Sequence, residues 1–301
     1  MQNTMHTTTQ DLICYKTMPP WNSLTLPETF RQRHNTQEHT WAKLTVLQGS
    51  LTFAFLTETD AALETALFTP QNQPPLVPPQ QWHRITDVSP DMACQLAFYC
   101  RPEDVYHLKY GLTRTHSEVI EAVNFIAPGK ALDLGCGAGR NALYLNLLGF
   151  DTTAYDKNPA SITELNTIID TEQLPHIKAK IYNINEQLIE DHYDFILSTV
   201  VMMFLQADKI PNVINNIQHH TNDGGLNLIV AAMSTDDYPC PLPFPFTFST
   251  GELKNYYRDW EILKYNEDIG QLHKTDAEGN RITLRFATLL ARKTPAQPMA
   301  R

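Results

Sequence analysis

The chain is poor in cysteine, and the cysteines that it has show no pairing pattern. There are five, an odd number without a C-x-x-C spacing: Cys14, Cys94, Cys100, Cys136 and Cys240. Disulfide-stabilised secreted domains carry even sets, and structural zinc sites usually carry C-x-x-C pairs. The sequence therefore predicts neither a disulfide framework nor a zinc site, and it favours the reducing cytoplasm.

Long apolar runs and an excess of positive charge are also missing. The longest nearly apolar run, FILSTVVMMFL, has 11 residues, whereas a membrane-spanning helix needs about 20. The N-terminal MQNTMHTTTQDL lacks the basic and then apolar layout of a signal peptide. The formal net charge is -10, and nucleic-acid-binding proteins usually present a basic face. We expect neither a membrane span nor a nucleic-acid substrate.

Residues 1–104 have the period of an all-β domain. In LTFAFL and MACQLAFYC, large apolar residues alternate with smaller or more polar ones, and Gly49 marks a turn before the first of these strands. The proline-dense segment PQNQPPLVPPQQWH is expected to be irregular and on the surface.

The pattern changes over residues 105–301, where strands alternate with helices. Thr115 begins a capping-box sequence, THSE, before the first helix. The strands KALDLG, DTTAYD, KAKIYNI, YDFILST and LNLIVAAM follow, separated by helical segments. Such alternation predicts an α/β fold, with a parallel sheet covered by helices on both faces. The last two strand-like runs, WEILKYNEDIG and RITLRFATLLARK, predict an antiparallel hairpin at the sheet edge.

The stretch ALDLGCGAGRN carries the clearest binding signal. Its glycines have the spacing GxGxG, and Arg140 stands where a dinucleotide fingerprint would have its third glycine. A P-loop would need GK followed by Ser or Thr, which GRN does not supply. Glycines allow the sharp turn and the close approach of a ligand. We interpret Gly135 and Gly137 as part of a nucleotide-binding loop.

Two carboxylates help to distinguish an S-adenosylmethionine site from a dinucleotide site. Asp133 precedes the first glycine by two residues, where a negative charge suits the cationic methionine end of S-adenosylmethionine better than a pyrophosphate. Asp156 lies 21 residues beyond Gly135, at the end of the next predicted strand. An acid at that place binds ribose hydroxyls in both cofactor classes. Together they favour S-adenosylmethionine, and an NAD-dependent oxidoreductase is the alternative.

Residues from about 105 to 295 resemble the tellurite-resistance methyltransferases of the TehB type, within the class I S-adenosylmethionine-dependent superfamily. The resemblance is carried by stretches that include KYGLTRTHSEVIEAV, LDLGCGAGRNALYL, YDFILSTVVMMFL and GQLHKTDAEGNRITLRFATLLARK. It implies a Rossmann-like seven-stranded sheet with an antiparallel last pair. The first hundred residues resemble a small cupin-like β domain, through WNS and VPPQQWH.

The resemblance also implies roles for further residues. Asn183 stands where such enzymes commonly have an acid near the adenine, and Ile184 follows it with a backbone donor. Thr199 is a candidate for the wall beside the methionine, and Arg114 is a candidate clamp for the methionine carboxylate. The complete expected cofactor-binding set is Lys109, Tyr110, Arg114, Asp133, Gly135, Gly137, Asp156, Asn183, Ile184 and Thr199.

The methyl acceptor is predicted from QLHKTDAEGNR. His273, Lys274 and Arg281 form a cationic group in an acidic chain, and such a group can hold a small oxyanion such as tellurite or selenite. A solvated hairpin tip is the competing interpretation. The loop STDDYPCPLPFPF is expected to wall the acceptor pocket, with Cys240 in a structural or lining role.

Other functions stay open at this stage. A thiol or another small molecule could be the acceptor, or the protein could be a sensor that holds S-adenosylmethionine without turnover. His34, Glu38, His39 and His83 are poorly spaced for a metal, so we expect a metal-free β domain. That domain could bind a small ligand, stabilise its neighbour or contribute to a homodimer.

Overall fold

The computed structural model describes residues 11–275 and 278–295. Its contacts divide the chain into two compact units that meet between Leu112 and Thr113. The sequence-based division between residues 104 and 105 stays a proposal. Each unit is described below by itself.

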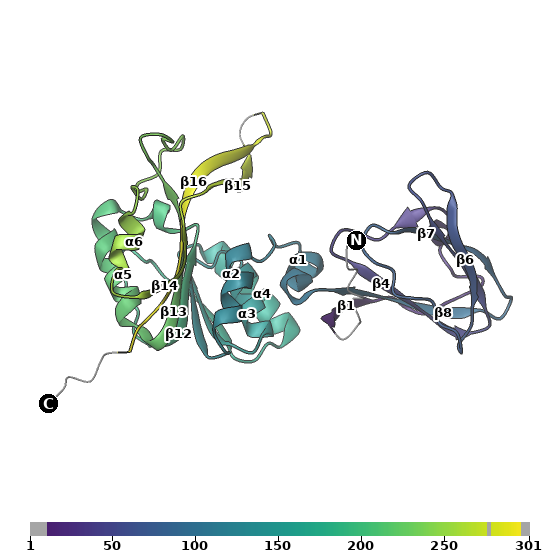
Figure 1. The fold of residues 1–301 in the computed structure, drawn as a ribbon. Coiled ribbons are helices and arrows are strands. Elements are labelled where there is room, and N and C mark those ends of the chain that lie inside the picture. Colours follow the sequence, from purple (N-terminus) through teal and green to yellow (C-terminus); the bar gives the residue numbers. More distant parts are fainter. Residues whose placement is uncertain (1–10, 276–277, 296–301) are drawn as a thin grey trace. The chain divides into compact units, whose positions relative to one another are not determined.

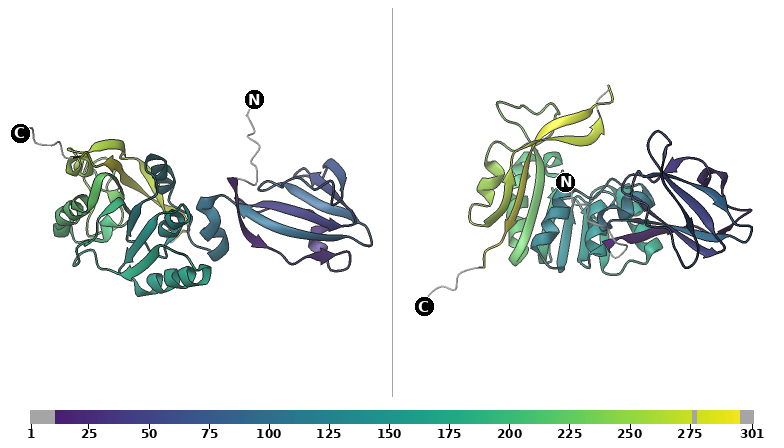
Figure 2. Two further views of the ribbon diagram at one scale, coloured as in Figure 1. Left: turned by 90° about the horizontal axis from the view of Figure 1, so that it is seen from below. Right: turned by 45° about the vertical axis from the view of Figure 1, so that its right-hand side comes forward.

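The N-terminal unit consists of two antiparallel sheets of four strands each, which form two layers (Figure 1 and Figure 2). In one sheet β8 pairs with β1, β2 and β4, and in the other the order is β3-β7-β5-β6. A short helix, α1 (Val105–Tyr110), ends the unit. The strands are β1 (Ile13–Thr17), β2 (Trp21–Asn22), β3 (His34–Asn35), β4 (Trp41–Gln48), β5 (Leu51–Leu56), β6 (Ala62–Phe68), β7 (Trp82–Val88) and β8 (Ala93–Cys100).

The turn predicted at Gly49 carries the chain from one sheet to the other. Its φ is 65°, and a Cβ there would lie 2.9 Å from Cα of Met92, so a side chain would not fit. Apolar side chains from both sheets, Leu44 and Phe53 among them, form one buried cluster. The proline-dense segment is not wholly on the surface, because Val77 is buried and exchanges two backbone hydrogen bonds with Ala42.

The C-terminal unit contains one sheet with the order β11-β10-β9-β12-β13-β16-β14, and β15 pairs with β16. Strands β9 to β13 are parallel, whereas β16 is antiparallel to both of its neighbours in that order. This is the predicted α/β fold. The strands are β9 (Lys130–Leu134), β10 (Asp151–Asp156), β11 (Ile177–Ile181), β12 (Tyr193–Thr199), β13 (Thr221–Met233), β14 (Glu261–Asn266), β15 (Ile269–Thr275) and β16 (Arg281–Arg292).

Helices cover both faces of this sheet. Figure 1 shows α2, α3 and α4 on one face and α5 and α6 on the other. No helix in the described ranges is long and apolar enough to cross a membrane. The helices are α2 (Ser117–Ala122), α3 (Arg140–Leu147), α4 (Pro159–Glu172), α5 (Ile210–His219) and α6 (Glu252–Tyr256).

One local prediction was wrong. The cap of α2 is His116, whose Nδ1 accepts from the Glu118 N–H at 3.2 Å, while Thr115 points its hydroxyl to the Arg140 carbonyl at 3.4 Å. The predicted antiparallel pair at the sheet edge is confirmed, because the edge strand β14 pairs antiparallel with β16. The two strands are not joined directly, since β15 follows β14 and pairs with the first part of β16 in a hairpin that rises beyond the sheet (Figure 1).

Candidate active site

The glycine loop joins β9 to α3 at the carboxyl end of the central strand. Gly135 and Gly139 have φ values of 79° and 90°. A Cβ on Gly135 would lie 2.3 Å from Cγ2 of Val201, and one on Gly139 would lie 2.4 Å from Cδ1 of Leu165. These two glycines are therefore required for packing within the protein.

Gly137 has a different environment. Its φ is 55°, and no atom of the described residues lies within 4 Å of the position that a Cβ would take. Its N–H donates to Oδ2 of Asp156 at 2.9 Å, and Oδ1 of Asp156 accepts from the Asn158 N–H at 2.8 Å. The loop is thus open at Gly137, where a ligand can approach the backbone beside an oriented carboxylate.

Asp133 is a buried carboxylate in β9. Its side chain is 1% exposed, and neither oxygen makes a hydrogen bond of normal geometry within the described residues. Burial raises its pKa to about 7, and the charge of Asp156 adds to the effect. The Arg140 guanidinium and the Ala142 N–H oppose this rise in pKa. An unpaired buried carboxylate is costly unless a cation reaches it.

These features fit S-adenosylmethionine. Asp133 is suited to its cationic end, Asp156 to its ribose hydroxyls, and Gly137 to close contact with its body. The part of the chain that the structure describes contains no cluster of three or more His, Cys, Asp or Glu side chains arranged for a metal ion.

The neighbouring strand ends bring further predicted residues to this edge. After β11, Oδ1 of Asn183 accepts from the Asn185 N–H at 3.2 Å. Ile184 lines a cavity of about 270 Å³ together with Leu134. Tyr182 stacks on Tyr155 with ring centroids 4.4 Å apart. The third strand thus ends in an ordered turn beside an aromatic pair.

Thr199 ends β12 and is held from α3. Nδ2 of Asn141 donates to Oγ1 of Thr199 at 3.0 Å, and Oδ1 of Asn141 accepts from the His116 N–H at 3.0 Å. This buried amide, which the sequence analysis missed, connects the segment before α2 to the end of β12. Its position directly after Arg140 was the available signal, because the first turn of a helix behind a glycine loop faces the site.

The residue after Thr199 has a strained backbone. Val200 has a φ of 62°, which β-branched residues rarely adopt. Its N–H donates to the Val230 carbonyl at 2.6 Å, and the next side chain, Val201, packs against Gly135. Strain of this kind is concentrated at functional sites.

Three predicted cofactor-binding residues, Lys109, Tyr110 and Arg114, lie upstream of α2, and Arg114 contacts α3 through its backbone. The Arg114 carbonyl accepts from Nη1 of Arg140 at 3.2 Å, so the backbone of residue 114 lies beside α3. Lys109 and Tyr110 belong to α1 in the N-terminal unit, where Nζ of Lys109 lies 5.8 Å from the Tyr110 ring centroid. Their role in cofactor binding stays a prediction.

The predicted acceptor residues are on the β15–β16 hairpin. Arg281 is exposed at the start of β16, and the side chains of His273 and Lys274 lie outside the described residues. Arg285, on the same strand, was not among the predicted residues. Arg285 pairs in register with Met233, the last residue of β13. The period of two along β16, counted from Arg281, was the available signal.

Arg285 is anchored by the loop that follows β13. Its Nη2 donates to Oδ2 of Asp237 at 2.9 Å, and its guanidinium lies 5.9 Å from the Tyr238 ring centroid. Its Nε is buried and has no hydrogen-bond partner in the described ranges. Further along the loop, Phe244 packs edge-on against Phe204 at 5.2 Å. The loops after β12 and β13 therefore contact each other through aromatic rings.

Comparison with known proteins agrees with this arrangement. A family model described as "Tellurite resistance protein TehB" matches residues 98–290, and one described as "TehB-like domain" matches residues 16–96. Two Haemophilus influenzae proteins, from strains 10810 and Rd, are named probable S-adenosyl-L-methionine-dependent methyltransferase TehB. Each is 54% identical over 283 residues, which is 94% of this chain and 99% of the relative.

Two further relatives extend the comparison. A protein named hemagglutinin 1 from Eikenella corrodens is 50% identical over 215 residues, 71% of each chain. The crystal structure of TehB from Haemophilus influenzae superposes with a TM-score of 0.93 at 53% identity, and the match covers 95% of this chain and 100% of that one. The chain therefore belongs to the TehB family and is an S-adenosylmethionine-dependent methyltransferase.

Proposed function

We propose that the enzyme methylates a small soft nucleophile, most favourably tellurite and also selenium oxyanions, and that it thereby detoxifies tellurite. The observation that carries this proposal is the position of Arg285. Its backbone pairs with Met233 at the end of β13, and its guanidinium contacts the loop that follows. Met233 lies three residues beyond Val230, the register partner of Thr199. Arg285 thus stands roughly 10 Å further out than the end of β12, where an acceptor would approach.

The cationic groups are suited to an oxyanion. Arg285 keeps a buried Nε–H without a partner in the described part of the chain, although Asp237 accepts from its Nη2. Arg281 lies on the same strand, closer to the hairpin tip. Guanidinium groups bind oxyanions with directed, charge-assisted hydrogen bonds. His273 and Lys274 remain proposed partners in this group.

The reaction needs positioning more than acid–base chemistry. Bound S-adenosylmethionine supplies a methyl carbon whose bond to the sulfonium breaks, with the electron pair staying on sulfur, as the chalcogen lone pair forms the new bond. The protein would hold the oxygens through arginine and exclude water with the Phe204–Phe244 contact. Cys240 lies in this loop with its Sγ 3.6 Å from the Leu242 carbonyl, which supports a lining role.

The test is formation of S-adenosylhomocysteine on addition of tellurite, selenite or a small thiol. We expect Arg285→Leu to lower turnover of the oxyanions roughly 10- to 100-fold, as the loss of a charged hydrogen bond predicts, without a change in S-adenosylmethionine affinity. Arg292→Leu is the matched control, because it removes an ion-paired arginine from the other end of the same strand. Turnover of the thiol alone would reject the oxyanion proposal.

We also propose that the enzyme acts in the cytoplasm. All five cysteines are free thiols, which suits a reducing compartment.

A further inference from the structure

The N-terminal unit contains a cavity of about 300 Å³ between its two sheets. Core side chains such as Leu44, Phe53 and Leu96 form its walls. Trp21 and Phe30 also line it, with ring centroids 5.1 Å apart. The volume lies at the lower end of the range for small-molecule sites, which is roughly 300–1,000 Å³.

The lining also has polar members: exposed Lys16, Asn35 and Gln37, the hydroxyls of Tyr15, Thr36 and Thr40, and two imidazoles. His34 of β3 and His83 of β7 are register partners, and their ring centroids lie 4.2 Å apart. Phe53 stacks on His83 at 5.2 Å with an interplanar angle of 17°, and Phe30 meets His34 edge-on at 5.3 Å. Both imidazoles are therefore fixed by aromatic neighbours and face the cavity.

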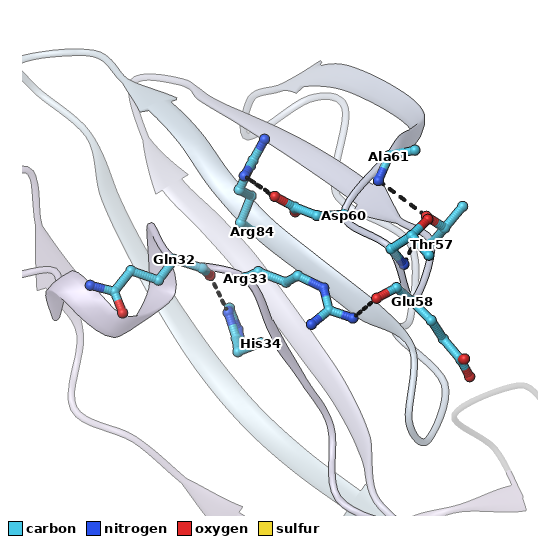
Figure 3. Close-up of polar contacts among 9 residues, drawn as sticks. Gln32, Arg33, His34, Thr57, Glu58, Asp60, Ala61 and Arg84 are labelled. Atoms are coloured by element: carbon cyan, nitrogen blue, oxygen red, sulfur yellow. Dashed lines mark hydrogen bonds and ion pairs between the residues drawn. The ribbon is translucent and has the colours of Figure 1, made fainter.

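Backbone carbonyls determine which ring nitrogen carries the proton. Nδ1 of His83 lies 2.7 Å from the Gln81 carbonyl, and Nδ1 of His34 lies 2.9 Å from the Gln32 carbonyl. A carbonyl only accepts, so each Nδ1 carries a hydrogen. Figure 3 shows His34 turned to Gln32, while Arg33 extends to the Glu58 carbonyl.

The free nitrogen of His83 is an acceptor. Burial lowers its pKa to about 4, so the ring is neutral at pH 7 and Nε2 carries a lone pair. Other buried polar groups on the cavity wall have protein partners. Thr36 donates to the Pro78 carbonyl at 2.6 Å, and the Thr40 hydroxyl lies 3.1 Å from that of Tyr15. Nε2 of His83 has no such partner within the described residues.

We propose that this cavity binds a small, neutral, largely apolar molecule of one or two rings that donates an N–H or O–H group to Nε2 of His83. The buried part of the lining is largely apolar and therefore favours a weakly hydrated ligand, and the unpaired Nε2 acceptor favours a ligand with a donor group. This site is separate from the proposed oxyanion chemistry.

A metal ion is the competing occupant, since metal-binding imidazoles are also oriented through Nδ1–H. The described residues do not provide a third ligand. Of the other candidates from the sequence, His39 lies 3.4 Å from Glu38 and 3.7 Å from Asp104. They are engaged with each other rather than with the His34–His83 pair.

Calorimetry on the full chain tests the proposal with two probes, indole and benzofuran. The probes have the same size and shape, but benzofuran has an oxygen in place of the N–H donor. We expect indole to bind roughly tenfold more tightly than benzofuran, as one hydrogen bond predicts. His83→Phe keeps a ring against Phe53 but removes the acceptor, so it should bind both probes equally.

The controls separate this result from misfolding. His192→Phe changes an exposed histidine of the other unit and should keep the preference for indole. Benzofuran binding by His83→Phe with the affinity of the unmodified protein reports that the N-terminal unit is folded. Equal binding of the two probes by the unmodified protein would overturn the proposal without reference to any variant. Failure of both to bind, or stoichiometric Zn²⁺ binding that His83→Phe abolishes, would also overturn it.

Discussion

The N–H of Gly137 donates to Oδ2 of Asp156 across 2.9 Å, so the glycine loop and the end of the next strand are linked directly. The second oxygen accepts from the Asn158 N–H. A carboxylate offers about four acceptor positions, and these two bonds therefore orient Asp156 while leaving positions for ribose hydroxyls.

Replacing Asp156 with Asn should weaken cofactor binding. One of the two backbone N–H groups would face an amide NH₂ instead of an acceptor, and the charge that holds the ribose would be lost. We expect the Kd for S-adenosylmethionine to rise roughly 10- to 100-fold, measured by calorimetry. Asp151→Asn is the control, because it changes an exposed acid at the opposite end of the same strand. Equal effects of the two changes would contradict the assigned role.

Gly137 and Gly135 should respond differently to alanine. Gly137→Ala should fold, because its Cβ would point into open space, at a cost of about 1–2 kcal/mol of unfolding free energy for its left-handed backbone. It should bind the cofactor more weakly, because the Cβ would occupy the space through which the ligand approaches the backbone. Gly135→Ala should lose more of its free energy of unfolding, since its Cβ would meet Val201 at 2.3 Å. Urea unfolding and calorimetry measure the two effects.

A second change tests the cause. In Gly135→Ala combined with Val201→Ala, the obstructing methyl groups are gone, so part of the lost unfolding free energy should return. If the double variant loses as much unfolding free energy as the two single variants together, or more, the contact with Val201 is not the reason for glycine at this position.

Local patterns predicted the fold and the placement of the candidate cofactor-binding carboxylates. The α/β fold followed from alternating periods of hydrophobicity. Asp133 and Asp156 lie at the carboxyl ends of adjacent strands, as their places beside the glycine loop implied. Each of these features depends on residues close together in the sequence.

The acceptor side could not be predicted in the same way. The position of Arg285 at the carboxyl end of β13 depends on the pairing of β16 with β13, between segments more than fifty residues apart. The cap at His116 likewise depends on Asn141, which binds the backbone of the segment from α3. Long-range pairing decided both, and the periodicity within one segment does not show which distant segment it pairs with.

Thr199→Val should destabilise the protein although the two side chains have similar shapes. The buried Nδ2 of Asn141 would lose its acceptor, which costs about 1–3 kcal/mol of unfolding free energy. Thr199→Ser keeps the hydroxyl and should retain most of the stability. Urea unfolding at pH 7 compares the two variants. A valine variant as stable as the serine variant would show that Asn141 finds another partner.

Asp133 predicts a pH dependence of stability and of cofactor binding. Its pKa is about 7 in the folded protein and about 3.9 in an unfolded chain. Between these values the folded state holds a proton that the unfolded state has released, so the contribution of Asp133 to stability falls as the pH rises from 4 to 7. Above pH 7 the carboxylate is charged in both the folded and the unfolded state, and the folded state bears the full free-energy cost of burying that charge.

Asp133→Asn should therefore be more stable than the unmodified protein at pH 7.5, by about 1.4 kcal/mol for each unit of pKa shift that it removes, and nearly equal at pH 4. The same variant should bind S-adenosylmethionine weakly at every pH. In the unmodified protein the affinity should fall about tenfold per pH unit below 7, because the proton must leave before the cation binds. Urea unfolding and calorimetry across this range measure both effects. An affinity that stays constant from pH 7.5 to pH 5.5 would show that the Asp133 carboxylate is already charged before the cofactor arrives.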